Sequence, residues 1–132
     1  MTRKQSEPSQ RFGKRVGAIT KGNNTTMIVV NTETIAGYQI REIKGIVQGN
    51  TVRAKHAGRD IAAGLKNLVG GELKGYTELL QDSREEAVSR MVEEARSMGA
   101  NAVLNLRFVT TSITAGAAEI LAYGSAVTIE KV

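Results

Sequence analysis

The chain contains no cysteine and a single histidine, His56, in 132 residues. Without cysteine there is neither a disulfide framework nor a thiolate ligand for a soft metal ion. One imidazole cannot by itself complete a metal site or supply the usual base of a nucleophilic enzyme. Tight binding of a heavy metal is therefore not expected, unless symmetry brings several copies of His56 together.

Aromatic residues and proline are also scarce. Two Phe, three Tyr and no Trp leave an aliphatic core, and one Pro against fourteen Gly indicates tight turns and close backbone contacts. No apolar run approaches the roughly 18 residues of a membrane span, and no apolar segment follows the basic N-terminus as it would in a secretory signal. We therefore expect a single cytoplasmic domain without a membrane partner.

The positive charge is confined to the first part of the chain. Residues 1–26 hold six basic side chains and one acidic, a net of +5, whereas residues 27–132 hold twelve of each. The sequence thus predicts a basic, disordered extension over 1–26 and a folded domain over 27–132, which lacks the basic excess of a nucleic-acid-binding domain. The extension is either an inert tail, upstream of a true start at Met27, or an arm that binds nucleic acid weakly and with salt sensitivity.

The strongest pattern runs from Tyr76 to Phe108. Apolar residues recur at three- and four-residue steps, which places them on one face of a helix: Tyr76, Leu79, Leu80, Ala87, Val88, Met91, Val92, Ala95 and Met98. Acidic, basic and serine residues take the opposite face. Gly99 is expected to end this helix in a left-handed conformation. From Asn101 the period changes to two, which predicts a strand to about residue 110 with Ala102, Leu104, Leu106 and Phe108 on one side.

Other elements flank this stretch. We expect strands over 27–35 and 39–48, a bulge or close neighbour at Gly45, a turn at Gly49–Asn50 and a short extended segment over 51–55. A short helix is predicted over 58–69, the long helix begins near Glu72, residues 111–116 form a loop, and 117–132 form a last strand. The order strand, strand, helix, helix, strand, strand predicts an α+β domain of two layers, a mixed or antiparallel sheet packed by one long and one short helix.

Small residues are concentrated in the last strand, at Ala117, Ala118, Ala122, Gly124, Ser125 and Ala126. A subunit of this size would pack thinly there. We therefore expect the backbone of another subunit to approach this strand, which favours a homo-oligomer that a bulky residue at Gly124 would disrupt.

A set of polar residues forms the candidate interface or ligand pocket: Asn50, Arg53, His56, Arg59, Asp60, Glu78, Arg84, Asn101, Glu119 and Tyr123. Glu119 and Tyr123 interrupt an apolar strand, so partial burial between subunits is expected. A buried carboxylate needs a cationic partner, which Arg53, Arg59 or Arg84 could supply. Structural pairing and a small-ligand pocket both remain open, and Asp60 at a helix start has the simpler role of stabilising the helix dipole.

No catalytic motif occurs. The sequence has no G-x-S-x-G nucleophile elbow, no dinucleotide-binding glycine fingerprint and no phosphate-binding loop with its lysine. Met91 and Met98 are expected to fill the core. We therefore predict no cofactor, no metal site and no enzymatic activity.

Several strings together resemble the YbjQ-like family, small bacterial and archaeal proteins that carry a heavy-metal-binding label. They are TETIAGYQI (32–40), GIVQGNTVRA (45–54), GRDIAAGLKNLVGGELKGYTELL (58–80), REEAVSRMVEEARSMGANAV (84–103) and AAEILAYGSAV (117–127). The resemblance extends from Met27 to about Glu130, with Gly-Ser-Ala-Val where the family usually has Gly-Thr-Ala-Val.

The resemblance implies a compact α/β subunit with a dodecin-like layout that assembles into a ring, most often a homopentamer. It implies no particular reaction. The resulting hypothesis is a ring-forming binding or scaffold protein, and the alternative is a small-molecule or metal-ion binding protein with sites at subunit interfaces.

Overall fold

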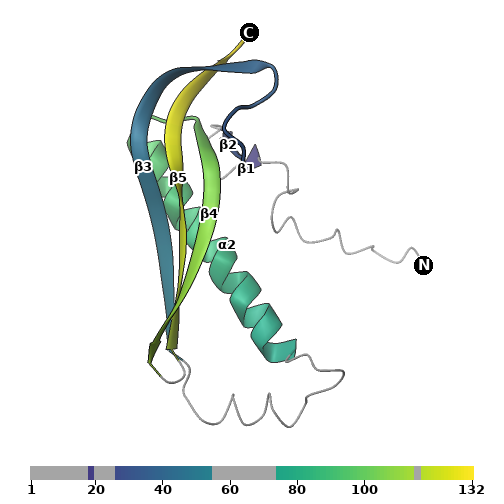
Figure 1. Ribbon diagram of the computed structural model, residues 1–132, viewed down its shortest axis with the longest axis vertical. Helices are drawn as coiled ribbons and strands as arrows, with labels where there is room; N and C mark the ends of the chain where they lie inside the picture. Colours follow the sequence, from purple (N-terminus) through teal and green to yellow (C-terminus); the bar gives the residue numbers. More distant parts are fainter. Residues whose placement is uncertain (1–17, 20–25, 55–73, 115–116) are drawn as a thin grey trace, which may run out of the picture.

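The computed structural model describes residues 18–19, 26–54, 74–114 and 117–132 as one helix against a five-stranded sheet (Figure 1). The elements are β1 (Ala18–Ile19), β2 (Met27–Val29), β3 (Tyr38–Ala54), α2 (Lys74–Ser97), β4 (Ala102–Thr114) and β5 (Ala117–Lys131). The strand order is β1-β2-β4-β5-β3, with β2 parallel to β4 and the other neighbours antiparallel. The predicted α+β class is confirmed, whereas the short helix expected over 58–69 lies outside the described residues.

The core lies between α2 and the sheet. In Figure 1 the helix crosses behind the long strands at a slant, and it contacts mainly β3 and β5. The expected apolar face is confirmed, because Ala87, Met91, Val92 and Ala95 are all at most 1% exposed and pack on sheet residues such as Val47 and Ile120. Burying each larger aliphatic side chain stabilises the fold by about 1.5–3 kcal/mol.

The end of α2 is set by Gly99, as its sequence position predicts. Its φ is +79°, its N–H donates to the carbonyl of Arg96 over 2.9 Å, and the N–H of Ala100 donates to that of Ala95 over 3.1 Å. These two bonds satisfy the last carbonyls of the helix in a Schellman motif. The chain then turns directly into β4, so helix and strand form one continuous unit.

The prediction of a turn at Gly49–Asn50 is wrong. β3 continues without interruption to Ala54, and Gly49 lies where this strand comes closest to α2. A Cβ at Gly49 would be 2.2 Å from the carbonyl oxygen of Ala87 and 2.3 Å from the nitrogen of Met91. The glycine is required for close approach of two backbones and not for a change of direction.

The first predicted strand, 27–35, is shorter than expected. Only Met27–Val29 forms regular β2, although the N–H of Val30 donates to Val103 and those of Asn105 and Leu106 donate to Thr32 and Val30. The pairing becomes irregular because β4 bulges there, with Asn105 at φ +54° and a register shift between Leu104 and Arg107. A second bulge, at Gly45 (φ +134°) in β3, confirms the expectation for that glycine.

The bulge at Asn105 also changes which side chains share a face. Ala102 and Leu104 belong to a cluster on the face opposite α2, while Val103 and Leu106 pack on the helix side. The predicted grouping of Ala102, Leu104 and Leu106 on one face is therefore wrong, because one irregular residue reverses the alternation. β4 also runs on to Thr114, through most of the loop predicted over 111–116.

Three of the six small residues of β5, Ala122, Gly124 and Ala126, pack within the chain itself. Ala122 and Ala126 are fully buried in the cluster under α2, and a Cβ at Gly124 would be 2.7 Å from Val103 Cγ1 and 2.8 Å from the Leu104 oxygen. Packing inside the subunit explains the small size of these residues, without the approach of another subunit. Gly124→Val would destabilise the subunit directly.

β1 lies within the segment that the sequence predicts to be disordered. Ala18 pairs with Ile28 and Ile19 with Met27, in antiparallel register. The pairing shows that β1 is not unpaired chain, while the domain boundary at Met27 stays a prediction.

Candidate functional site

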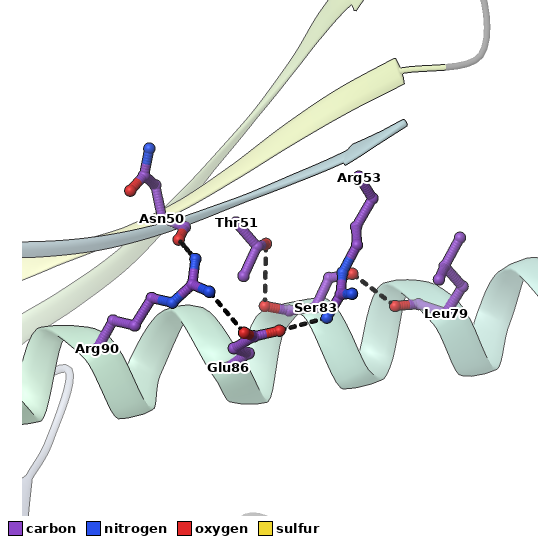
Figure 2. Close-up of polar contacts among 7 residues, drawn as sticks. All are labelled: Asn50, Thr51, Arg53, Leu79, Ser83, Glu86 and Arg90. Atoms are coloured by element: carbon purple, nitrogen blue, oxygen red, sulfur yellow. Dashed lines mark hydrogen bonds and ion pairs between the residues drawn. The ribbon is translucent and has the colours of Figure 1, made fainter. Parts of the chain in front are cut away.

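The densest polar contacts join α2 to β3 (Figure 2). Glu86 accepts a hydrogen bond from Arg53 of the strand and another, at 2.6 Å, from Arg90 one helical turn later. Arg90 also donates to the backbone carbonyl of Asn50 over 2.6 Å. All three charged side chains are more than one third exposed, so this cluster orients the strand on the helix and contributes little to stability per ion pair.

Two buried hydroxyl groups lie in the same contact. Thr51 Oγ1 donates to the carbonyl of Ser83 over 3.2 Å, and Ser83 Oγ donates to the carbonyl of Leu79 over 2.7 Å (Figure 2). Both side chains are at most 2% exposed, and each hydroxyl proton is directed at a backbone oxygen. Because each proton is already held by a carbonyl, these hydroxyls have a structural role.

A second polar group lies on the opposite side of the sheet, here called the open face. Residues directly opposite each other on neighbouring strands share a face. Asn50 donates to Glu119 over 3.1 Å there. Leu121 of β5 lies opposite Asn50, and Tyr123, two residues farther along β5, lies on the same face opposite Arg107 of β4. Glu119 and Tyr123 are half-buried, and Asn50 and Arg107 are exposed. The open face thus presents the carboxylate of Glu119, the phenol of Tyr123, the amides of Asn50 and Gln48 and the guanidinium of Arg107 among aliphatic side chains.

The structure separates several of the predicted site residues. Asn50 and Glu119 are brought together, but Arg53 points to the helix side and pairs with Glu86 instead. Arg53 is therefore not the cationic partner of Glu119, because successive strand residues point to opposite faces. Glu78 and Arg84 are exposed on α2. His56, Arg59 and Asp60 lie outside the described residues.

Asn101 has a structural role. Its side-chain amide donates to the carbonyl of Ile129 over 2.9 Å and accepts from the N–H of the same residue over 2.7 Å. The amide thereby extends the β4–β5 ladder by one step before β4 begins.

Sequence reasoning did not identify the helix residues that contact the strand edge. Glu86, Arg90 and Glu94 were assigned only to a solvated face, yet Glu94 accepts the N–H of Gln48 over 2.8 Å and Arg90 binds the Asn50 carbonyl. Their four-residue spacing with alternating charge was the available signal, because it places all three on one side of the helix.

One carboxyl group has a shifted pKa. Hydrogen bonds from Arg41 and from Gln39, together with the charge of Arg41, hold the pKa of Glu130 below its ordinary value of 4.5. Arg41 and Glu130 lie on β3 and β5 near the C-terminus, away from the polar group of the open face. The shift reflects an exposed ion pair and marks no reaction centre.

Within the described ranges, no three His, Cys, Asp or Glu side chains come close enough together to hold a metal ion. Among the described residues, no helix is both long and apolar enough to cross a membrane.

The fold and these contacts define a small α+β domain in which one helix covers one face of a mixed sheet. A family model described as "putative heavy-metal-binding" matches residues 27–130, and the chain belongs to this YbjQ family. The match confirms the family resemblance of the sequence.

Relatives come from both bacteria and archaea. A UPF0145 protein of Hahella chejuensis is 61% identical over 104 residues, which cover 79% of this chain and 100% of the relative. One from Archaeoglobus fulgidus is 58% identical over 101 residues, covering 76% of this chain and 94% of the relative. One from Thermotoga maritima is 54% identical over 106 residues, covering 80% and 100%.

The fold is similar to a crystal structure from Pediococcus pentosaceus, titled as a protein with unknown function of the DUF74 family. The TM-score is 0.56 at 14% identity, with 79% of this chain and 98% of that chain covered. This similarity supports the one-helix, mixed-sheet architecture and says nothing of a ligand.

Proposed function

We propose that the chain is the subunit of a closed ring of identical copies, five being preferred, which acts as a binding or scaffold protein and not as an enzyme. The observation that carries this proposal is the open face. Ile43, Ile46 and Val52 expose 73%, 77% and 54% of their surface on it. Exposed apolar surface concentrated on one side of a small domain is typical of a protein interface.

The residues opposite these three on β5 are one buried valine and two polar residues. Ile43 lies opposite Val127, Ile46 opposite Ser125 and Val52 opposite Glu119. On the other side of β5, Val109 is exposed opposite Leu121. One end of this face is covered within the chain, by a buried cluster that includes Val127 and Ile129. α2 covers the other face of the sheet, so a second copy is the simplest cover for the exposed remainder. The expected family layout favours closure into a ring of five.

The test is the native mass at micromolar concentration, measured by light scattering. We expect five chains of 14.2 kDa, or a multiple of five. Ile46→Asp should give smaller species, because it places a charge inside the contact. Val132→Asp is the matched control, since Val132 is 89% exposed at the C-terminus. A wild-type protein that elutes as a monomer would end the proposal.

A second candidate function is the binding of a small molecule or metal ion between subunits. The pair formed by Asn50 and Glu119 favours it, because a partner subunit over the open face would bury this carboxylate beside an amide, with no cationic partner among the described residues. A buried carboxylate is stabilised by a bound cation or hydrogen-bond donor. Such a ligand would be retained during native purification and lost in Glu119→Gln, as native mass spectrometry would show.

Zinc is the probe that tests the family description. Binding of Zn²⁺ should be weak, because each chain supplies one imidazole and no thiolate. If symmetry gathers the copies of His56, calorimetry should show less than one ion per chain and complete loss in His56→Ala. Submicromolar binding of one ion per chain that persists in His56→Ala would contradict this and point to the carboxylates.

A further inference from the structure

The outer edge of β4 is open over its second half. β2 pairs with β4 at Ala102 and Val103, and the chain after β2 accepts or donates bonds only as far as Leu106. Within the described ranges, no strand pairs with the outer edge of 107–114. Each side chain from Phe108 to Ile113 is exposed, and no residue from Phe108 to Thr114 carries a charge. An exposed, uncharged run of β-branched residues is a template for pairing with another strand.

The other long edge of the sheet is protected against such pairing. β3 carries two register shifts, before Glu42 and before Gly45, and the charged residues Arg41, Glu42 and Lys44 lie along the same stretch. Farther along, α2 occupies the edge, because Glu94 binds the N–H of Gln48 and Arg90 binds the carbonyl of Asn50. Bulges, charges and bonded edge groups are the devices by which proteins prevent edge-to-edge contact. From Phe108 to Ser112 β4 has none of these devices, because its one charge in this half, Arg107, comes before this stretch and its register shift, between Ser112 and Thr114, comes after it.

The pairing also shows which residues of β4 direct their backbone groups outward. A strand residue in an antiparallel ladder points its N–H and C=O to the same side. Because Gln48 and Asn50 point away from β5, Gly49 points toward its partner Ala122. Tyr123, Leu121 and Glu119 therefore point toward β4, where they meet Arg107, Val109 and Thr111. The alternate residues, Phe108, Thr110 and Ser112, direct their N–H and C=O groups to the outer edge, where no described strand pairs with them.

We propose that this edge pairs, antiparallel, with the same edge of a second copy of the chain. In the register centred on Thr110, Thr110 lies opposite Thr110 of the partner subunit, and Phe108 lies opposite Ser112 of the partner subunit. The two copies of this edge are compatible because the run from Phe108 to Thr114 carries no charge, so the pairing puts no like charges opposite each other. Among the described strands, β1 is only two residues long and β3 is protected, so β4 is the one free edge that a second copy offers.

This contact is independent of the ring. A ring repeats a head-to-tail contact, whereas the β4 pairing is two-fold and joins the same surface of both partners. Two-fold pairing makes the number of chains even whatever the number in the ring. Two rings of five would give ten chains.

Opposite charges at the two-fold position provide the test. Thr110→Lys and Thr110→Glu each place two like charges directly across the edge, so each variant alone should have half the native mass of the wild type. An equimolar mixture of the two variants should return to the wild-type mass. Ser97→Lys, an exposed site on α2, is the control and should leave the mass unchanged. Because Thr110 is exposed, its replacement should not unfold the subunit.

The outcomes separate this inference from the ring. A wild-type protein with an odd number of chains, or Thr110→Lys with unchanged mass, would overturn the β4 pairing and leave the ring standing. A wild-type dimer that becomes a monomer in Thr110→Lys would support the pairing and refute the ring. Because the chain lacks cysteine, Thr110→Cys adds a second readout. Its copies should form a disulfide under mild oxidation, whereas Thr111→Cys on the other face should not.

Discussion

Gly49 is the residue whose size most directly fixes the distance between helix and sheet. A methyl group there would overlap backbone atoms of α2, and backbone cannot rotate away as a side chain can. The contact explains why a glycine lies in the middle of a long strand, where it is otherwise unfavourable.

Gly49→Ala should lower the free energy of unfolding by about 3 kcal/mol, because α2 and β3 must move apart. Urea unfolding monitored by circular dichroism measures the loss. Gly37→Ala is the control: Gly37 has φ +81° but no atom within 4 Å of the added Cβ, so only backbone strain of about 1 kcal/mol applies. Equal losses in both variants would show that the close approach at Gly49 is unimportant.

Glu130 provides a prediction about pH. Its pKa is lowered in the folded chain, chiefly by the hydrogen bond from Arg41, so its contribution to stability is present above pH 4.5 and is lost as the pH falls through the folded pKa. The group is fully exposed, so the effect on stability is small and the titration itself is the better measurement. NMR titration of the Glu130 carboxyl should show a low midpoint that rises in Arg41→Met. A midpoint unaffected by that change would contradict the ion pair.

At the scale of elements, α2 is held to the sheet by two kinds of contact. The apolar face supplies most of the stability, and the cluster of Arg53, Glu86 and Arg90 fixes how the strand is placed along the helix. The open edge of β4 and the protected edge of β3 are properties of the sheet as a whole, because they depend on where the helix lies.

The Arg53–Glu86 pair should contribute little. A double-mutant cycle with Arg53→Met and Glu86→Gln is expected to give a coupling energy below about 1 kcal/mol, which disappears at high salt because both side chains are partly exposed. Denaturant unfolding of the four proteins measures it. Ser89→Ala, on the same helix, serves as a control for helix propensity. A large, salt-independent coupling would mean that this cluster is shielded from water, as by a bound partner.

At the scale of the whole molecule, the chain combines a neutral domain with a basic N-terminal segment. Deleting residues 1–26 should leave the melting temperature and the oligomer unchanged, because the described residues of that segment contribute two strand pairs, Ala18 with Ile28 and Ile19 with Met27. Weak binding to nucleic acid should disappear with the segment and with added salt. A loss of several degrees in thermal scans would show that the segment packs on the domain.

The sequence by itself determined the elements that rest on local patterns. The 3.6-residue period fixed the apolar face of α2, Gly99 fixed its end, and β-branched runs indicated the long strands. Each of these depends on residues close together in the chain, so no knowledge of the rest of the fold was needed.

Only the tertiary structure decided what depends on contacts between distant segments. Gly49 resembles a turn residue until α2 is placed against it, and the bulge at Asn105 reverses the faces of β4 after a regular start. Arg53 was one of three arginines considered as a partner of Glu119. The two residues lie on opposite faces because their strands pair in a particular register, which puts Arg53 beside Glu86 and Glu119 beside Asn50. Register, close approach and edge exposure are set by non-local packing, and local sequence does not encode them.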